Sequence, residues 1–469
     1  MTEAAAVSGA RAGVSRRVWR LVMLAALVHG LAYLVLLPPW MGEDEPWHVE
    51  YAGHVGQGHL PWGGEEMRFG DRELMSLSQL QVRRKVEGLE AEEILRTQWA
   101  LLDSMREHDF WARVDWAAWP GGAQSLDQVV EAHTAAHQPP LYYLLGGALL
   151  YVAGATDVEA RMWLLRILSL VAYVAVVAAT FALAERTCRD PWVAVACALL
   201  VAWWPMHARQ AGVANNDVLV KVLTSWTLLV AVDLAREGIT ARRMVKALAL
   251  CAAALATKTT GAAALAPVAL ACAWRGGRRA TGWSARHRTL LVGATLAVAA
   301  AGVALWAGTD NPAVPRTMEN VRMRLETAAS PEFRWEFART FVGAFNWYAR
   351  DLPSSVAGAL GAVGALAGLG LCAVLVRGRE GVDRRTLAFC IVTVVAQAAL
   401  VVLRGVAAGR YLMPALPALA VLACAGLLGP LPERRRPLAV ALLGGGLLVF
   451  DGLVLWAGLV WNQYALWGA

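Results

Sequence analysis

The chain has 469 residues, of which 58% are hydrophobic and only 17% are charged, and its formal net charge is +7. So many apolar stretches exclude an ordinary soluble globular protein and indicate a membrane protein with several spans. The basic excess does not indicate nucleic-acid binding, because the basic residues gather in short loops between apolar runs, where they set topology.

The first predicted element is a membrane helix over residues 18–37, which ends at two prolines. Three arginines precede it and a fourth, Arg20, lies in its first turn, and because basic residues favour the cytoplasmic side, we expect a cytoplasmic N-terminus. No small-residue cleavage site follows the apolar run, so we expect this helix to remain uncleaved.

Three carboxylates, Glu43, Asp44 and Glu45, follow directly behind this helix, and His48 comes shortly after them. Charged groups are costly near hydrocarbon, so a cluster at the point where a helix leaves the bilayer is a candidate for function. The alternative is that these side chains are only solvated at the helix exit.

A long polar loop then extends to about residue 138, and residues 76–111 within it have the pattern of amphipathic helices lying on the outer leaflet. His137 begins the segment His-Gln-Pro-Pro-Leu-Tyr-Tyr, which opens an apolar run to about Ala155. This run is short compared with the roughly 20 residues of a typical span. Whether it crosses the bilayer determines every later orientation.

The basic residues of the later loops favour a run that does not cross. Taken alternately, one set of short loops holds 18 Lys and Arg residues and the other holds 4, so the richer set is predicted to be cytoplasmic. This agrees with a cytoplasmic N-terminus only if the run after His137 is re-entrant or interfacial. The alternative, a true span with twelve crossings in all, gives the wrong charge bias.

The predicted fold class is therefore an all-α polytopic membrane protein with about eleven transmembrane helices. Its expected parts are the N-terminus with the first helix (1–37), a first extracytoplasmic loop with interfacial helices and a re-entrant segment (38–160), core transmembrane helices (161–307), a second large extracytoplasmic loop (308–353) and C-terminal transmembrane helices (354–469). The stretch 245–274 is too long for one crossing, so we expect a helical hairpin with Lys258 at its outer tip.

This topology places polar side chains from distant loops on the outer side of the membrane. Beyond the first loop they include Asp217, Lys258, Arg404, Arg410 and Tyr411. Carboxylates and isolated cations on one face suggest chemistry on an anionic, lipid-borne substrate. Each residue also has a purely structural interpretation. Lys258 would extend its charge into water from a turn, Arg410 would anchor a helix end at the interface, and Asp217 would cap the helix that follows it. For Asp217 the structural interpretation is favoured. Arg161 and Arg166, at the start of a span, are interpreted as interfacial anchors.

In order and in side of the membrane, these motifs resemble those of GT-C-fold glycosyltransferases. An acidic pair follows the first span, His-x-Pro-Pro-Leu-Tyr-Tyr closes the first outer loop, an Asp opens the fourth span, and Lys-Thr-Thr-Gly forms a turn. Similar polytopic enzymes are the protein O-mannosyltransferases and the lipid A aminoarabinose transferases. Residues 341–347 and 409–414 further resemble a largely uncharacterised bacterial branch, and the likeness covers most of the chain.

The resemblance implies a plasma-membrane enzyme that takes a sugar from polyprenyl phosphate and passes it to an acceptor hydroxyl. Asp44 matches the catalytic position, although the neighbouring carboxylates leave a misassignment by one residue open, and Glu45 is the second acidic residue of the motif. The donor-binding residues are then Lys258, Arg410, Tyr411, His137 and Asp217. A divalent metal is possible, with Glu45, His48 and His137 as candidate ligands.

The chemistry of the residues agrees with this assignment. Transfer from a lipid phosphate needs a base for the acceptor proton and cations for the departing phosphate, whereas a general acid is unnecessary because phosphate is a good leaving group. A single displacement that inverts the anomeric carbon is expected. Two other functions stay open: a transporter or flippase for lipid-linked sugars, and a non-enzymatic scaffold for envelope assembly.

Overall fold

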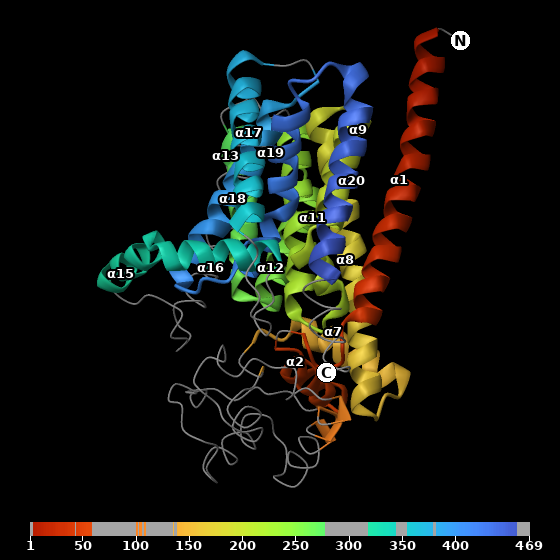
Figure 1. Cartoon of the computed structure of the whole chain (residues 1–469), viewed down its shortest axis with the longest axis vertical. Coiled ribbons are helices and arrows are strands. Elements are labelled where there is room, and N and C mark those ends of the chain that lie inside the picture. The colour runs from red at the N-terminus through yellow and green to blue at the C-terminus, as the bar shows by residue number, and fades with distance from the viewer. Residues whose placement is uncertain are drawn as a thin grey trace.

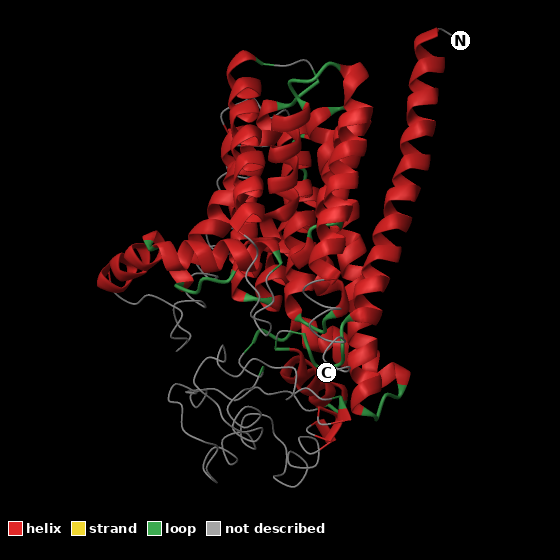
Figure 2. Ribbon diagram, in the orientation of Figure 1, coloured by secondary structure: helices red, strands yellow, loops and turns green. Residues whose placement is uncertain are grey.

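The computed structural model describes residues 3–42, 44–58, 100–101, 103–105, 107–108, 135, 138–276, 318–343, 354–378 and 381–456. All regular secondary structure in these ranges is helical, without a strand (Figure 2). Most of the long helices run side by side in one bundle, and α2 and α7 lie at one of its ends (Figure 1).

Seven helical segments in the described ranges are long and apolar enough to cross a membrane. They are Arg17–Leu36 of α1 (Glu3–Leu36), α8 (Val158–Cys188), α11 (Asn216–Glu237), Ala359–Arg377 of α17 (Ser354–Arg377), α18 (Arg384–Arg404), η4 with α19 (Gly409–Ala415 and Leu416–Leu428), and η5 with α20 (Glu433–Arg435 and Arg436–Val454). The expected span over 289–306 lies outside the described residues, and a count of eleven spans is not confirmed.

An eighth span is possible but is sharply bent. Helix α9 (Pro191–Ala202) and the pair α10 (Pro205–Arg209) and η2 (Gln210–Gly212) meet at an angle of 62°. Pro205 explains the break, because proline has no N–H to continue the preceding helix and suits the first turn of a new one. The sequence suggested a span that ends near Pro205 and an outer loop behind it, so the helical segment after the proline was not expected.

The expected hairpin is formed by α12 (Ala241–Thr257), η3 (Thr259–Ala264) and α13 (Leu265–Gly276). Lys258 stands in extended conformation between α12 and η3. Gly261 then packs onto the carbonyl of Ala254 so closely that a Cβ would overlap it. The backbone therefore turns back tightly and fixes Lys258 at the turn.

Helices α2 (Glu45–Gly56) and α7 (Leu141–Ala153) pack against each other outside the set of long helices (Figure 1). A Cβ on Gly147 would lie 2.7 Å from the backbone N of Gly56, so two glycines permit this close crossing. With 13 residues, α7 is about 20 Å long, well below the roughly 30 Å of the hydrocarbon core.

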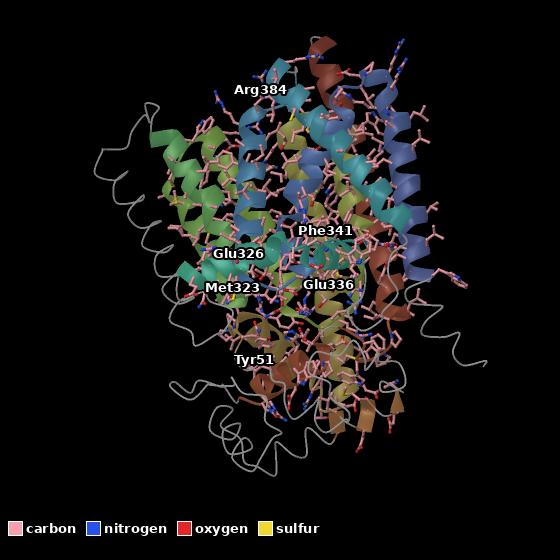
Figure 3. All side chains as sticks on the ribbon, turned by 60° about the vertical axis from the view of Figure 1, so that its left-hand side comes forward. Tyr51, Met323, Glu326, Glu336, Phe341 and Arg384 are labelled. Carbon is pink, nitrogen blue, oxygen red and sulfur yellow. The ribbon has the colours of Figure 1, made fainter. Side chains whose placement is uncertain are left out.

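Two helices of the second large loop, α15 (Met318–Ala329) and α16 (Pro331–Val342), extend across the bundle, as the labelled Met323, Glu326 and Phe341 show (Figure 3). The sequence analysis assigned no helix there. The carboxyl end of α16 is tied to two neighbours: Gly409 N donates to Thr340 Oγ1 at 2.8 Å, and Trp204 Nε1 donates to the Phe341 carbonyl at 2.7 Å. Helix α16 thus supports η4, which carries Arg410.

Candidate active site

The segment between α1 and α2 turns sharply at Asp44. This residue occupies the N-cap position of α2 with φ 58°, in the left-handed region that Asp and Asn tolerate better than most residues. Its Oδ2 accepts a hydrogen bond from Arg410 Nη2 at 3.0 Å, and its side chain is 46% exposed. The next residue, Glu45, is turned to the interior of the protein, so two adjacent carboxylates have different surroundings.

Glu45 is fully buried in an ion pair with Arg166. The distances are 2.8 Å from Nε to Oε1 and 2.6 Å from Nη2 to Oε2. The backbone N–H groups of Gly42 and Ala214 donate to the same carboxylate at 3.2 and 2.9 Å. Arg166 also donates to the carbonyls of residues 37 and 38. Glu45 therefore ties the segment after α1 to α8 and to the chain before α11, and its oxygens are not open to a substrate.

The interpretation of Arg166 as an interfacial anchor is wrong, because its side chain is 0% exposed and bonded throughout. Its position held a signal that the sequence analysis did not use: Arg166 stands two turns inside α8. An arginine within a span needs a partner, and a carboxylate near the membrane edge is the natural one. Arg161 is also buried, and its Nε donates to the Ala155 carbonyl at 3.1 Å.

Lys258 and Asp217 form a second, largely buried ion pair at this end of the bundle, with side chains 7% and 6% exposed. Lys258 Nζ also lies 3.4 Å from Asn216 Oδ1. The N-cap of α11 is Asn215, whose side chain accepts from Asp217 N at 2.7 Å, so the interpretation of Asp217 as the cap is wrong. Lys258 does not snorkel into water, because its charge is held by Asp217.

The ring of Tyr411 brings the cations of the site together. Lys258 Nζ, Arg404 Cζ and Arg410 Cζ lie 5.2, 4.2 and 5.2 Å from its centroid. The aromatic face attracts cations, and Gln397 fixes the backbone below it by donating to the Tyr411 carbonyl at 2.6 Å. Three cations thus converge on Tyr411 from α18, η4 and the α12–η3 turn. Lys258 and Arg410 are two of them, and the sequence analysis expected these two side chains to lie on the same side of the membrane.

His48 lies one turn after Asp44 on α2 and is held by aromatic neighbours. Its Nδ1 is 2.7 Å from the Tyr143 hydroxyl, and the two rings are stacked with centroids 5.8 Å apart. Tyr143 is the last residue of the His-x-Pro-Pro-Leu-Tyr-Tyr segment and joins this segment to α2 through His48. The imidazole is 4% exposed.

Burial and the neighbouring charges set the protonation states of Asp44 and His48. Burial raises the pKa of Asp44, but the positive charges of Arg410, of His48 once it is protonated at low pH, and of Lys258 outweigh burial and lower that pKa to about 2. Burial is the largest influence on His48, and it lowers the pKa of the imidazole to about 4 although Asp44 opposes the shift. At neutral pH, Asp44 is therefore ionised and His48 is neutral.

The structure brings Asp44, His48, Asp217, Lys258 and Arg410 to one site around Tyr411. Glu45 is next to Asp44 in sequence but belongs to the buried pair with Arg166. Glu43 and His137 lie outside the described residues. Within the described ranges, no group of three or more His, Cys, Asp or Glu side chains is placed to hold a metal, and Glu45 is already bonded to four donors.

Two solved structures resemble this fold. They are ArnT from Cupriavidus metallidurans bound to undecaprenyl phosphate, with a TM-score of 0.49, and the same protein in the apo state, with a TM-score of 0.46. In both cases the identity is 16%, and the match covers 93% of this chain but only 64% of the ArnT chain. The likeness is too distant for a function to be transferred from it.

A search of curated proteins finds no match. A family model described as a predicted membrane protein, DUF2142, matches residues 27–419, which is most of the sequence. This agrees with the seven helices that are long and apolar enough to span a membrane. The chain belongs to the DUF2142 family of membrane proteins.

Proposed function

We propose that the protein is a GT-C-like membrane glycosyltransferase that moves a sugar from a polyprenyl-phosphate donor to an acceptor hydroxyl. The observation that carries the proposal is the meeting of Asp44 with three cations around Tyr411 at one end of the helix bundle. Among the residues that the structure describes, three cations face the carboxylates of Asp44 and Asp217, and this positive excess suits an anion such as a lipid phosphate. Convergent polar groups of this kind mark binding sites.

In this proposal Asp44 takes the proton of the acceptor hydroxyl while the hydroxyl oxygen attacks the anomeric carbon. The bond from that carbon to the phosphate oxygen breaks, its electron pair stays on the phosphate, and the configuration inverts. A positioned base contributes about 10²–10⁴-fold to the rate. Lys258, Arg404 and Arg410 stabilise the phosphate as its charge grows, which is an electrostatic effect of fixed cations at a water-poor site.

The proposed location is the bacterial plasma membrane, with the N-terminus in the cytoplasm and the site on the extracytoplasmic side. The support is the unequal distribution of Lys and Arg between alternate loops. A donor on a polyprenyl lipid would approach through the bilayer, which fits a site at the end of a bundle of apolar helices.

The test is sugar transfer in membranes supplied with a labelled polyprenyl-phosphate sugar. Asp44→Asn is expected to lower transfer by about 10²–10⁴-fold at unchanged protein level, because the amide cannot accept the proton. The matched control is Asp233→Asn, which removes a carboxylate at the other end of α11 and is expected to leave transfer unchanged. Full activity of the Asp44 variant would refute the mechanism.

A transporter or flippase of lipid-linked sugars is the second candidate, and the bend between α9 and α10 favours it. Broken helices with buried polar groups form the central sites of many transporters. Beside this bend, Lys221 is fully buried and bonds to His207, at 2.9 Å from Nζ to Nδ1, and to Gln210. Movement of labelled lipid across proteoliposomes without product formation, retained in Asp44→Asn, would support this candidate over the enzyme.

A further inference from the structure

Both acids of the site hold the cations that the donor phosphate needs. Asp44 accepts from Arg410 at 3.0 Å, and Asp217 is paired with Lys258. A carboxylate and a phosphate offer the same kind of oxygen to a guanidinium, so they compete for its N–H groups. Asp44 therefore occupies the place on Arg410 that a lipid phosphate would take.

The two ion pairs differ in how easily they can separate. The Lys258–Asp217 pair is buried on both sides, and separating it would leave charges without a partner in a poorly hydrated place. Asp44, in contrast, is 46% exposed and can be hydrated when it leaves Arg410, which is 12% exposed. Exposed ion pairs are weak, so this pair is the one that a ligand can open.

Arg410 does not depend on Asp44 for its position. Its guanidinium lies 5.2 Å from the Tyr411 ring centroid, and its Nη2 lies 3.4 Å from the Tyr411 hydroxyl. Its backbone is fixed by η4, because a Cβ on Gly409 would overlap the backbone N of Phe341. Arg410 can thus change its acidic partner while its own place in the site is kept.

We infer that Arg410 exchanges Asp44 for the donor phosphate, so that Asp44 becomes free to meet the acceptor only after the donor has bound. This inference rests on the proposed glycosyltransferase function and adds an order of binding to it. A carboxylate that has lost a cationic neighbour holds a proton more strongly, so the exchange also turns Asp44 into a better base.

The same exchange explains how the spent lipid phosphate leaves. After transfer, Asp44 carries the acceptor proton and is neutral, so it does not compete for Arg410. Once that proton passes to water, the Asp44 carboxylate returns to Arg410 and displaces the phosphate. Asp44 thus acts twice in each cycle, first as base and then as the competing ligand.

The test is the affinity of the full-length protein in detergent for a polyprenyl phosphate without sugar. Asp44→Asn is expected to bind this lipid about tenfold more tightly than the wild type, because a negative charge beside the phosphate is removed. Arg410→Gln is expected to bind it more weakly. Asp233→Asn, a control at the remote end of α11, is expected to bind as the wild type does.

Equal or weaker binding by a folded Asp44→Asn variant would overturn the inference. Asn is tolerated at φ 58°, and Asp44→Gly, which is still more compatible with that backbone, serves as a second variant with the same expected gain. A wild-type protein that binds no polyprenyl phosphate would instead refute the proposed function. The two failures are therefore distinguishable.

Discussion

Both ends of the helix bundle carry ion pairs, but one end builds them on regular helices and the other largely on turns and 3₁₀ segments. Arg384 and Tyr51 mark the two ends in Figure 3. At the Arg384 end the pairs are Arg186 with Asp233, Arg236 with Asp383, and Arg436 with Asp190. These residues stand at the ends of regular helices, and Asp190 and Asp383 also cap α9 and α18. Each of these three carboxylates has a structural task.

At the Tyr51 end the charges stand on irregular backbone. Asp44 has a left-handed conformation, Lys258 is extended before a 3₁₀ segment, and Arg410 lies within another. The cations outnumber the acids around Tyr411 and share its face. The comparison teaches that the carboxylates of the regular end join neighbouring helices, whereas the described part of the irregular end carries three cations against two acids, which the proposed function uses to bind the donor phosphate.

The largest expected effect comes from the buried pair that supports the irregular end. Arg166→Met leaves the Glu45 carboxylate buried without its partner, and we expect a loss of about 3–5 kcal/mol in the free energy of unfolding. The measurement is denaturant unfolding in mixed micelles. The double variant Glu45→Gln with Arg166→Met buries no charge and is expected to recover part of the loss. Wild-type stability of the single variant would contradict a structural role.

The positions of the long spans were predictable because hydropathy directly reports lipid exposure. The expected span 18–37 corresponds to Arg17–Leu36 of α1, and the expected core region 161–307 contains most of α8 (Val158–Cys188) and all of α11 (Asn216–Glu237). The bend before Pro205 was missed, since a proline at the end of an apolar run fits either a stop or a break. Helices α15 and α16 were missed because each has only 12 residues, four of them charged, so neither stands out by hydropathy.

The sequence pointed to Asp44, Lys258 and Arg410 as site candidates, but it did not predict which acid pairs with which cation. The short loops assigned to the extracytoplasmic side hold few Lys and Arg residues, so Lys258 and Arg410 were distinguishable in the sequence, and Asp44 was distinguishable by its place directly behind the first span. Which acid meets which cation depends on the rotation and depth of helices that are far apart in the chain. The partner of Glu45, Arg166, is 121 residues away, and hydropathy carries no information on that contact.

An intermediate effect on the free energy of unfolding is expected when the pH is lowered, because His48 takes up a proton more readily in the unfolded chain. Its pKa is lowered to about 4 in the fold, so the unfolded chain, with an ordinary histidine pKa near 6.5, binds the proton more strongly. Stability is therefore fully present above about pH 6.5 and falls as the pH drops towards 4, by up to about 3 kcal/mol. Unfolding of wild type and His48→Gln across this range measures it.

His48→Gln is expected to reduce the slope of the profile between pH 6.5 and pH 4, because the variant lacks the imidazole that takes up a proton on unfolding in this range. The Asp44 contribution is separate, since its lowered pKa of about 2 places its loss of stability below the ordinary carboxyl pKa of about 4. An unchanged slope in the variant would assign the pH dependence to another group.

The smallest effect is expected at the regular end. Arg186 and Asp233 are 34% and 23% exposed, with 2.8 Å between Nε and Oδ1. Half-exposed pairs of this kind contribute about 0–1 kcal/mol, because hydration replaces most of the attraction. Asp233→Asn is therefore expected to change the free energy of unfolding by less than about 1 kcal/mol, with unchanged lipid binding and transfer. A large loss of transfer in this variant would show that the two ends of α11 are coupled, and the contrast between a structural end and a functional end would have to be abandoned.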